Sequence, residues 1–533
     1  REGGAVVVRW IPAEGRFAIA GRPSVHVPMS TCAHGHAASA FRTFAPMQGR
    51  FLRNLALVVV LNLLVKPFYI LGIDAAVQER VGAAAYGTYA ALLSLSFLLN
   101  ILLDLGLTNH TTRRLAREPG TMAAELPGLL GVRAALVVLY AVVTLATALV
   151  LGYGGLQLHL LGWLIVNQAL AALLLFLRGA VAAGQRYAQD SLLSVLDRAL
   201  LIGGMAWLLW GRGPDAPLPI LWFVQAQTVV YVVAVGVAWA LVRRQTRALR
   251  PRWPGRAAGD LLRRSFPYAL LVLLMTFYYR TDTVMLERLL PDGPLQAGIY
   301  AQAFRFFEAF NMLGYLLAGP LLPLFSPLPG GRAPGAPPPP LAFRLVWAGT
   351  VALAVLAVLL APEVMALRYT AHVAESAPVL AVLGVSFVAV CTTYVFGTLL
   401  TAGGDLRTLN RLAAAGMVAN LALNLWLIPR HQGLGAAWAS LITQSAMAIA
   451  QAVLAARRFS LPRGASAWGG PVLYAAGLAA VALGLGTVDA APLTVLLGVP
   501  AAALLLAFAT RTLRAADLRG LRAPAAGGTG SVL

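Results

Sequence analysis

The chain has 533 residues, of which 59% are hydrophobic and only 11% are charged, and its mean hydropathy is +0.76. Soluble domains carry roughly 25% charged residues, so this composition excludes a water-soluble globular protein and predicts an all-α integral membrane protein. The net charge of +21 does not indicate nucleic-acid binding, because the arginines lie in short breaks between apolar stretches.

The first 49 residues differ from the rest of the chain. They are mostly polar or small, contain no long apolar run, and lack the order of segments that a signal peptide needs. Met47 stands just ahead of the first apolar stretch, so we expect residues 1–49 to be a disordered leader or a mis-assigned start. Cys32 lies near His34 and His36, but their number and spacing do not fit a usual metal site. No metal or cofactor is predicted.

Apolar stretches follow one another from residue 52 to residue 511, and about fourteen of them have the length of roughly 20 residues that spans a bilayer. We expect spans at 52–73, 84–107, 129–151, 158–178, 191–211, 218–242, 265–286, 298–324, 343–362, 375–402, 408–428, 433–456, 468–488 and 492–511. This order predicts an N-terminal six-helix lobe at 50–242, a basic linker at 243–264, a C-terminal six-helix lobe at 265–458, two extra transmembrane helices at 459–512 and a tail at 513–533.

The distribution of arginines between the loops predicts the orientation of these spans in the membrane. With the N-terminus in the cytoplasm, the outer loops hold only Arg80, Arg212, Arg288, Arg368 and Arg430, and the other loop arginines fall inside. The opposite orientation would violate the rule that cytoplasmic loops are rich in positive charge. We therefore expect a multi-pass protein of the bacterial inner membrane with both termini in the cytoplasm.

Two segments look like copies of each other. YGTYAALLSLSFLLN (86–100) and AGIYAQAFRFFEAFN (297–311) both begin a span, directly after an outer loop, with Gly-x-Tyr-Ala. Transporters are often built from repeated halves with the substrate path between them. The alternative is a coincidence between two alanine-rich helices.

The motifs of several enzyme classes are missing. The only lysine, Lys66, follows Val65, so no Walker A loop is present, and there is no Gly-x-Ser-x-Gly or His-Glu-x-x-His motif. We therefore expect a protein that is not an enzyme.

The first, seventh and eighth predicted spans contain charged residues: Lys66 in the first, Arg280 and Asp282 in the seventh, and Arg305 and Glu308 in the eighth. Charges inside a bilayer are costly and mark functional candidates. Lys66, Arg280 and Arg305 are predicted to bind substrate as a cationic group in a water-filled cavity. The alternatives are structural ion pairs or side chains that reach the interface. Arg305 and Glu308 are three residues apart and can pair, whereas Arg280 and Asp282 point in different directions and need separate partners, with a contact between the seventh and eighth spans as one candidate.

Three carboxylates are candidates for ion coupling or for ion pairing: Asp104, Asp282 and Glu308. Asp104 lies near the cytoplasmic end of the second span. For this position, a group that stabilises the helix end is a more common role than a proton carrier.

Three stretches resemble polysaccharide-biosynthesis flippases, the O-antigen flippase-like branch of the multidrug/oligosaccharidyl-lipid/polysaccharide exporter superfamily. They are residues 86–117, with Gly-x-Tyr and later Asp-x-Gly; residues 278–310, with Arg-x-Asp, Met-Leu and Gly-x-Tyr; and residues 420–443. The last is an asparagine-rich helix that ends in Leu-Ile-Pro and is followed by two glycines, with Asn420, Asn424, Pro429, Gly433 and Gly435 as its structural positions.

The resemblance implies a V-shaped bundle of two six-helix lobes, like that of drug and toxin extrusion (MATE) proteins, with two extra C-terminal helices and alternating access. It also implies an undecaprenyl-pyrophosphate-linked oligosaccharide as substrate, for lipopolysaccharide or another polysaccharide. Membrane lipids and other glycan-assembly proteins are the expected partners. A MATE-like cation-coupled small-molecule exporter is the alternative function, and a non-transporting scaffold of a glycan-assembly complex is a third.

Overall fold

The computed structural model describes residues 8–11, 16–19, 64–108, 122–213, 216–244, 256–318, 325, 339–462, 464–488 and 490–514. Several predictions fall outside these residues. They include the start of the first span, residues 245–255 of the basic linker, residues 109–117 of the first family motif, and the tail beyond residue 514.

Residues 1–57 and residues 58–533 form two separate compact units. In the first, strand β1 (Val8–Ile11) pairs antiparallel with β2 (Arg16–Ile19), and Val8 lies opposite Ile19. Most of the predicted leader lies outside the described residues and stays a prediction.

The second unit is helical throughout the described residues. Its first helix (64–81) contains a π-helical turn, η1 (Tyr69–Asp74), followed by α2 (Ala75–Val81). The other elements are α3 (Ala83–Leu98), η2 (Asn100–Leu103), α5 (Met122–Val150), α6 (Gly155–Ala183), α7 (Tyr187–Ala206), η4 (Trp207–Gly211), α8 (Ile220–Arg243), α9 (Arg256–Leu289), α10 (Gly293–Ala318), α12 (Pro339–Leu359), α13 (Ala361–Arg368), α14 (Val373–Ala402), α15 (Leu406–Arg458), α16 (Ala465–Thr487) and α17 (Pro492–Ala509). Among the described residues, ten helices are long and apolar enough to cross a membrane.

Helix boundaries follow local sequence chemistry. Pro219 immediately precedes α8 and Pro492 begins α17, because the fixed backbone angle of proline suits the start of a helix. The long α15 is bent at Gln432, which has φ 51° and ψ −132°, so its halves are the predicted spans 408–428 and 433–456. A Cβ at Gly435 would lie 2.3 Å from the carbonyl oxygen of Leu427, so the chain can fold back here only with glycine.

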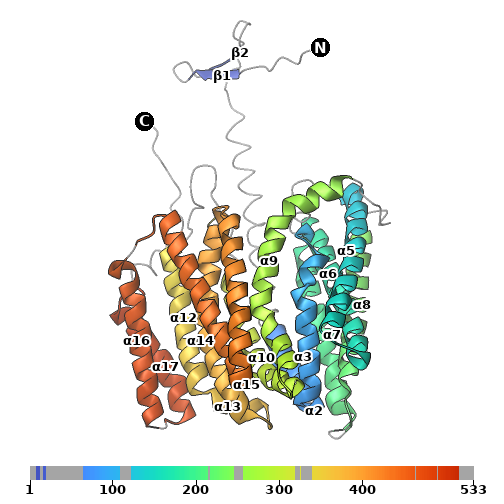
Figure 1. Ribbon diagram of the computed structural model, residues 1–533. Helices are drawn as coiled ribbons and strands as arrows, with labels where there is room; N and C mark the ends of the chain where they lie inside the picture. The colour runs from blue at the N-terminus through green and yellow to red at the C-terminus, as the bar shows by residue number, and fades with distance from the viewer. Residues whose placement is uncertain are drawn as a thin grey trace. The chain divides into compact units, whose positions relative to one another are not determined.

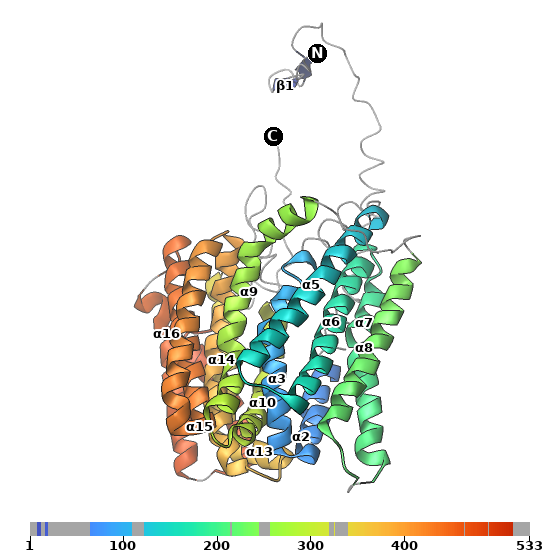
Figure 2. The same cartoon turned by 45° about the vertical axis from the view of Figure 1, so that its right-hand side comes forward.

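The helices form two lobes, as the sequence predicted. The N-terminal lobe comprises the first helix, α3 and α5–α8, and the C-terminal lobe comprises α9, α10 and α12–α15 (Figure 1). Each lobe is built around an apolar core, and the cores extend across the interface, because Val284 and Ala301 join the first core and Ala75 joins the second. The two extra helices α16 and α17 pack against each other and against α12, on the side away from α5–α8 (Figures 1 and 2). The all-α membrane fold is therefore confirmed.

The two lobes meet where α3 and α10 begin. A Cβ on Gly87 would lie 1.8 Å from the carbonyl oxygen of Pro294, and a Cβ on Gly298 would lie 1.9 Å from that of Ala83. Both glycines belong to the repeated Gly-x-Tyr-Ala segments. Side chains would prevent this approach, so the two copies of the repeat form a close backbone contact between the lobes.

Candidate functional site

A cavity of about 640 Å³ lies between the lobes. The first helix, α3, α6, α7 and α8 line it from the N-terminal lobe, and α9, α10 and α14 line it from the C-terminal lobe. Its polar lining residues are Lys66, Tyr69, Asp74, Tyr89, Asn167, Gln168, Arg178, Ser194, Arg198, Gln227, Tyr231, Arg280, Arg305, Glu308, Asn311 and Tyr394.

Basic side chains outnumber acidic ones in this lining. The five basic residues are Lys66, Arg178, Arg198, Arg280 and Arg305, and the two acidic residues are Asp74 and Glu308. The cavity wall therefore favours an anionic occupant.

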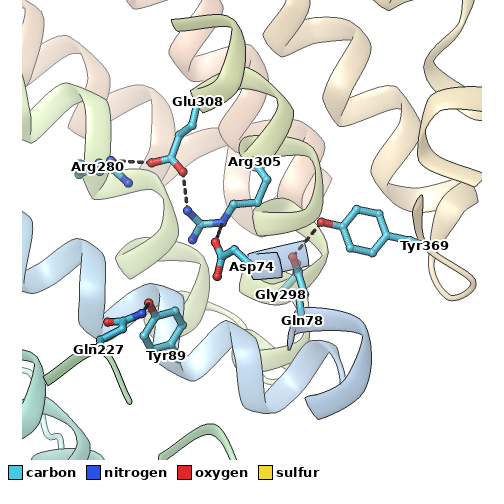
Figure 3. A network of polar contacts seen from close by, with 9 residues as sticks. All are labelled: Asp74, Gln78, Tyr89, Gln227, Arg280, Gly298, Arg305, Glu308 and Tyr369. Atoms are coloured by element: carbon cyan, nitrogen blue, oxygen red, sulfur yellow. Dashed lines mark hydrogen bonds and ion pairs between the residues drawn. The ribbon is translucent and has the colours of Figure 1, made fainter. Parts of the chain in front are cut away.

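An ion-pair network crosses the lobe interface beside the cavity (Figure 3). The Arg305 Nε lies 3.0 Å from the Asp74 Oδ2, and Arg305 also pairs with Glu308. Glu308 in turn accepts a hydrogen bond of 2.6 Å from Arg280. Asp74 and Arg305 are only 3% and 8% exposed. The Asp74–Arg305 pair thus ties the first helix to α10, and Glu308 extends the network to Arg280 of α9, so that the two arginines and two carboxylates balance in charge.

Three further cations line the N-terminal lobe. The Arg198 guanidinium lies 4.6 Å from the centre of the Tyr69 ring and donates a 3.2 Å hydrogen bond to the Tyr231 hydroxyl. Arg178 donates from Nε to Asp190 at 2.8 Å. Lys66 is half-buried and forms no ion pair with a carboxylate of the described residues.

Hydrogen bonds close the interface near the glycine contact. Gln78 donates to the Gly298 carbonyl at 2.8 Å and accepts from the Tyr369 hydroxyl at 3.1 Å (Figure 3). Arg368 donates to the carbonyls of Leu71 and Gly72, at 2.7 and 2.9 Å, within the π-helical turn. The first helix is therefore held to the C-terminal lobe from Leu71 to Gln78.

A second group of contacts joins the lobes through the α5–α6 loop. The Tyr153 hydroxyl donates to Glu287 at 2.8 Å, and the Arg288 guanidinium lies 3.6 Å from the centre of the Tyr153 ring. Arg288 also binds Glu287 and the Leu151 carbonyl. These contacts lie at the end of α9 that adjoins α10, which is the same end as the glycine contact.

Four residues predicted from the sequence come together at the cavity: Lys66, Arg280, Arg305 and Glu308. The predicted contact between the seventh and eighth spans is the Arg280–Glu308 pair, and the predicted pairing of Arg305 with Glu308 is also present.

Asp282 lies away from the cavity lining, inside the C-terminal lobe. It is 2% exposed and accepts hydrogen bonds from Asn424 at 2.7 Å and Tyr300 at 3.1 Å. Asn424 also donates to Asn420 at 3.0 Å. The asparagines of the family motif therefore anchor this buried carboxylate, while Pro429, Gly433 and Gly435 lie at or beside the bend of α15.

Asp104 is also absent from the cavity lining. It follows η2, accepts a hydrogen bond from the Thr108 backbone at 3.1 Å, and pairs with Arg133 of α5, which is 3% exposed. Arg133 donates to the Ala172 carbonyl at 2.8 Å as well. The position of Asp104 fits the predicted role of a group that stabilises a helix end.

Asp104→Asn is expected to lower stability, because it leaves the buried Arg133 guanidinium without its counter-charge. Breaking one side of a buried pair costs about 3–5 kcal/mol, and the partial exposure of Asp104 places the effect near or below the lower end. Thermal unfolding in detergent measures it, and Asp104→Asn/Arg133→Met should recover most of the loss. An unchanged melting temperature together with lost transport would instead support ion coupling by Asp104.

Sequence reasoning missed Asp74, Arg178 and Arg198. Asp74 lies one residue beyond the predicted end of the first span, and Arg178 is the last residue of the predicted span 158–178. Arg198 lies within the predicted span 191–211. Because a charge inside an apolar span is costly, the presence of an arginine there was the sequence signal that could have identified Arg198.

The comparisons agree with this architecture. The inward-closed lipid II flippase MurJ superposes with a TM-score of 0.64 at 10% identity, covering 87% of this chain and all of that one. An inward-facing multidrug-resistance MATE transporter of the MOP superfamily gives a TM-score of 0.54 at 15% identity, covering 74% of this chain and 94% of that one. These likenesses establish the fold. No curated protein matches the chain.

Fold and central cavity define a polytopic membrane protein of the MOP transporter fold. Residues 51–328, just over half of the chain, match the model of the polysaccharide biosynthesis protein family. The chain belongs to that family.

Proposed function

We propose that this protein is a flippase that moves an undecaprenyl-pyrophosphate-linked oligosaccharide across the bacterial inner membrane, for polysaccharide or O-antigen biosynthesis. The observation that carries the proposal is the charge of the cavity, where five basic side chains stand against two acidic ones. Family membership and the transporter fold support it.

The cavity offers what such a substrate needs. A diphosphate and sugar hydroxyls cannot enter hydrocarbon without partners, because unpaired polar groups are costly there. Arginine supplies paired donors that match phosphate oxygens. The amides of Asn167, Gln168, Gln227 and Asn311 supply donors and acceptors for hydroxyl groups. The polyprenyl tail stays in the bilayer.

The positive-inside rule supplies the orientation. Both termini then lie in the cytoplasm, and the joined ends of α3 and α10 face outward. The structure thus corresponds to a state that is closed to the outside, from which alternating access requires the glycine contact to open.

We assign the coupling of transport to an ion gradient to carboxylates, since the sequence has no nucleotide-binding loop. Glu308 is the first candidate, because it lies in the cavity between Arg280 and Arg305. Asp282 is the second, buried against Asn424 and Tyr300. A change in either charge alters a network that holds helices in place, so protonation at either residue can bias the equilibrium between states.

The rival function is a cation-coupled exporter of small cationic molecules. It requires carboxylates in excess of basic groups in the cavity, and the lining has the opposite balance.

A deletion strain tests the proposal. It should accumulate lipid-linked oligosaccharide in the inner leaflet of the membrane and lose surface glycan, and the wild-type gene should reverse both effects. Ethidium efflux from the same cells forms the second arm. Normal surface glycan without a trapped intermediate, combined with lost ethidium efflux, would replace the flippase by the exporter.

A further inference from the structure

We infer that the diphosphate of the substrate binds Lys66, Arg178 and Arg198 of the N-terminal lobe, while Arg305 joins the lobes through Asp74 and Arg280 stays paired with Glu308. The inference rests on the proposed function and divides the cavity cations into two groups with different tasks.

The deep arginines are already neutralised. Arg305 pairs with both Asp74 and Glu308, and Glu308 also binds Arg280. The side chain of Arg305 is only 9% exposed, so an anion reaches little of it. An incoming diphosphate would have to displace a carboxylate from a buried pair, which leaves that carboxylate unpaired at high cost.

The N-terminal lobe cations are less completely neutralised by carboxylates. The side chain of Arg198 is 27% exposed, and its Nε lies 3.6 Å from Asp197, a looser pair than those of Arg305. The Tyr69 ring and the Tyr231 hydroxyl fix the guanidinium plane. A guanidinium fixed in this way loses little freedom on binding phosphate, which favours affinity.

Arg178 and Lys66 complete the group. Arg178 donates to Asp190 through its Nε, so this hydrogen bond does not use the two terminal nitrogens of the guanidinium. Lys66 has no carboxylate partner among the described residues, and Arg178, Asp197 and Arg198 are the charged groups that act on it. Two of these three groups carry the same sign as the ammonium, so a further anion among the three cations reduces their repulsion.

The position of this site also determines the orientation of the substrate in the cavity. Lys66 precedes Asp74 by two helical turns, which is about 12 Å along the helix. A diphosphate at Lys66 thus lies on the cytoplasmic side of the closed interface. The sugars then extend toward Asn167, Gln168 and Gln227, which line the same half of the cavity.

Affinity for undecaprenyl pyrophosphate, measured on the full chain in nanodiscs, tests the inference. Lys66→Gln and Arg198→Gln are each expected to weaken binding about tenfold, the equivalent of 1.4 kcal/mol. The matched control is Arg430→Gln, which removes an exposed positive charge outside the cavity lining and should bind within about threefold of wild type. Asp190→Asn frees Arg178 and should tighten binding, an outcome that misfolding does not produce.

Two further ligands identify the source of the anion. Undecaprenol, which lacks phosphate, should bind weakly and equally to wild type and to Arg198→Gln. Phosphatidylglycerol competing as well as undecaprenyl pyrophosphate would show a site for ordinary lipid head groups and overturn the assignment.

The two proposals fail differently. If wild type does not bind undecaprenyl pyrophosphate, the proposed function fails. If wild type binds but Lys66→Gln, Arg198→Gln and Asp190→Asn all bind as tightly as wild type and the Arg430→Gln control, the flippase stands and this site is wrong.

Discussion

Gly298→Ala is expected to keep the outer ends of the two lobes from closing and to reduce transport by more than about tenfold. The new Cβ would lie 1.9 Å from the carbonyl oxygen of Ala83, and backbone, unlike a flexible side chain, cannot turn aside. Overpacking of this kind costs about 1–3 kcal/mol. Because the clash exists only in the closed state, about 2 kcal/mol would shift the equilibrium between states roughly thirtyfold.

The distance between spin labels on the outer ends of α3 and α10 reports the closed fraction, and a flippase assay reports transport. Gly162→Ala is the matched control, because a Cβ at Gly162 meets nothing within 4 Å. Equal label distances and equal transport in the two variants would remove the glycine contact from the closure mechanism.

Arg305→Gln is expected to have the largest effect on stability of any cavity substitution. It leaves the carboxylate of Asp74, which is 3% exposed, without its ion-pair partner. Glu308 also loses one of its two arginine partners. Removing one partner of a buried ion pair costs about 3–5 kcal/mol. We expect a marked loss of folded protein at 37 °C and, with it, loss of surface glycan in the complementation assay.

The double variant Asp74→Asn/Arg305→Gln separates pairing from substrate contact. Two neutral amides restore hydrogen-bonding capacity without a buried charge, so thermal stability should return toward that of wild type. If Arg305 serves only to join the lobes, undecaprenyl pyrophosphate binding should return too. A stable double variant that still fails to bind this lipid would make Arg305 a direct ligand.

Spans were the most predictable part of this molecule. Long apolar stretches have one stable form in a bilayer, the helix, because every backbone polar group must bond within its own segment. Even the bend within α15 was foreseen, from Pro429 and the glycines that follow it. The first helix was placed less well, because it continues past the predicted end at residue 73 to Val81, through polar residues that are buried against the other lobe.

Partners of the buried charges were less predictable. Arg305 and Glu308 are close in sequence, so their pairing follows from helix geometry alone. The pairing of Arg305 with Asp74 joins residues more than two hundred positions apart and depends on how two lobes meet. Hydropathy does not encode that contact. The Gly-x-Tyr-Ala repeat hinted at it, since its two glycines lie at this interface.

The contact between Arg368 and the π-helical turn couples the opening of the lobes to a rotation of the first helix. This side chain of the C-terminal lobe binds the carbonyls of Leu71 and Gly72. When the lobes part on the outer side, those carbonyls lose a charged donor. A π-turn holds one residue more than an α-turn, so relaxing it to α-geometry would rotate the preceding residues by about 100° about the helix axis. Lys66 belongs to the segment that turns, so opening the outer side would swing its ammonium away from Arg178 and Arg198 and weaken the hold on an anion as the exit opens.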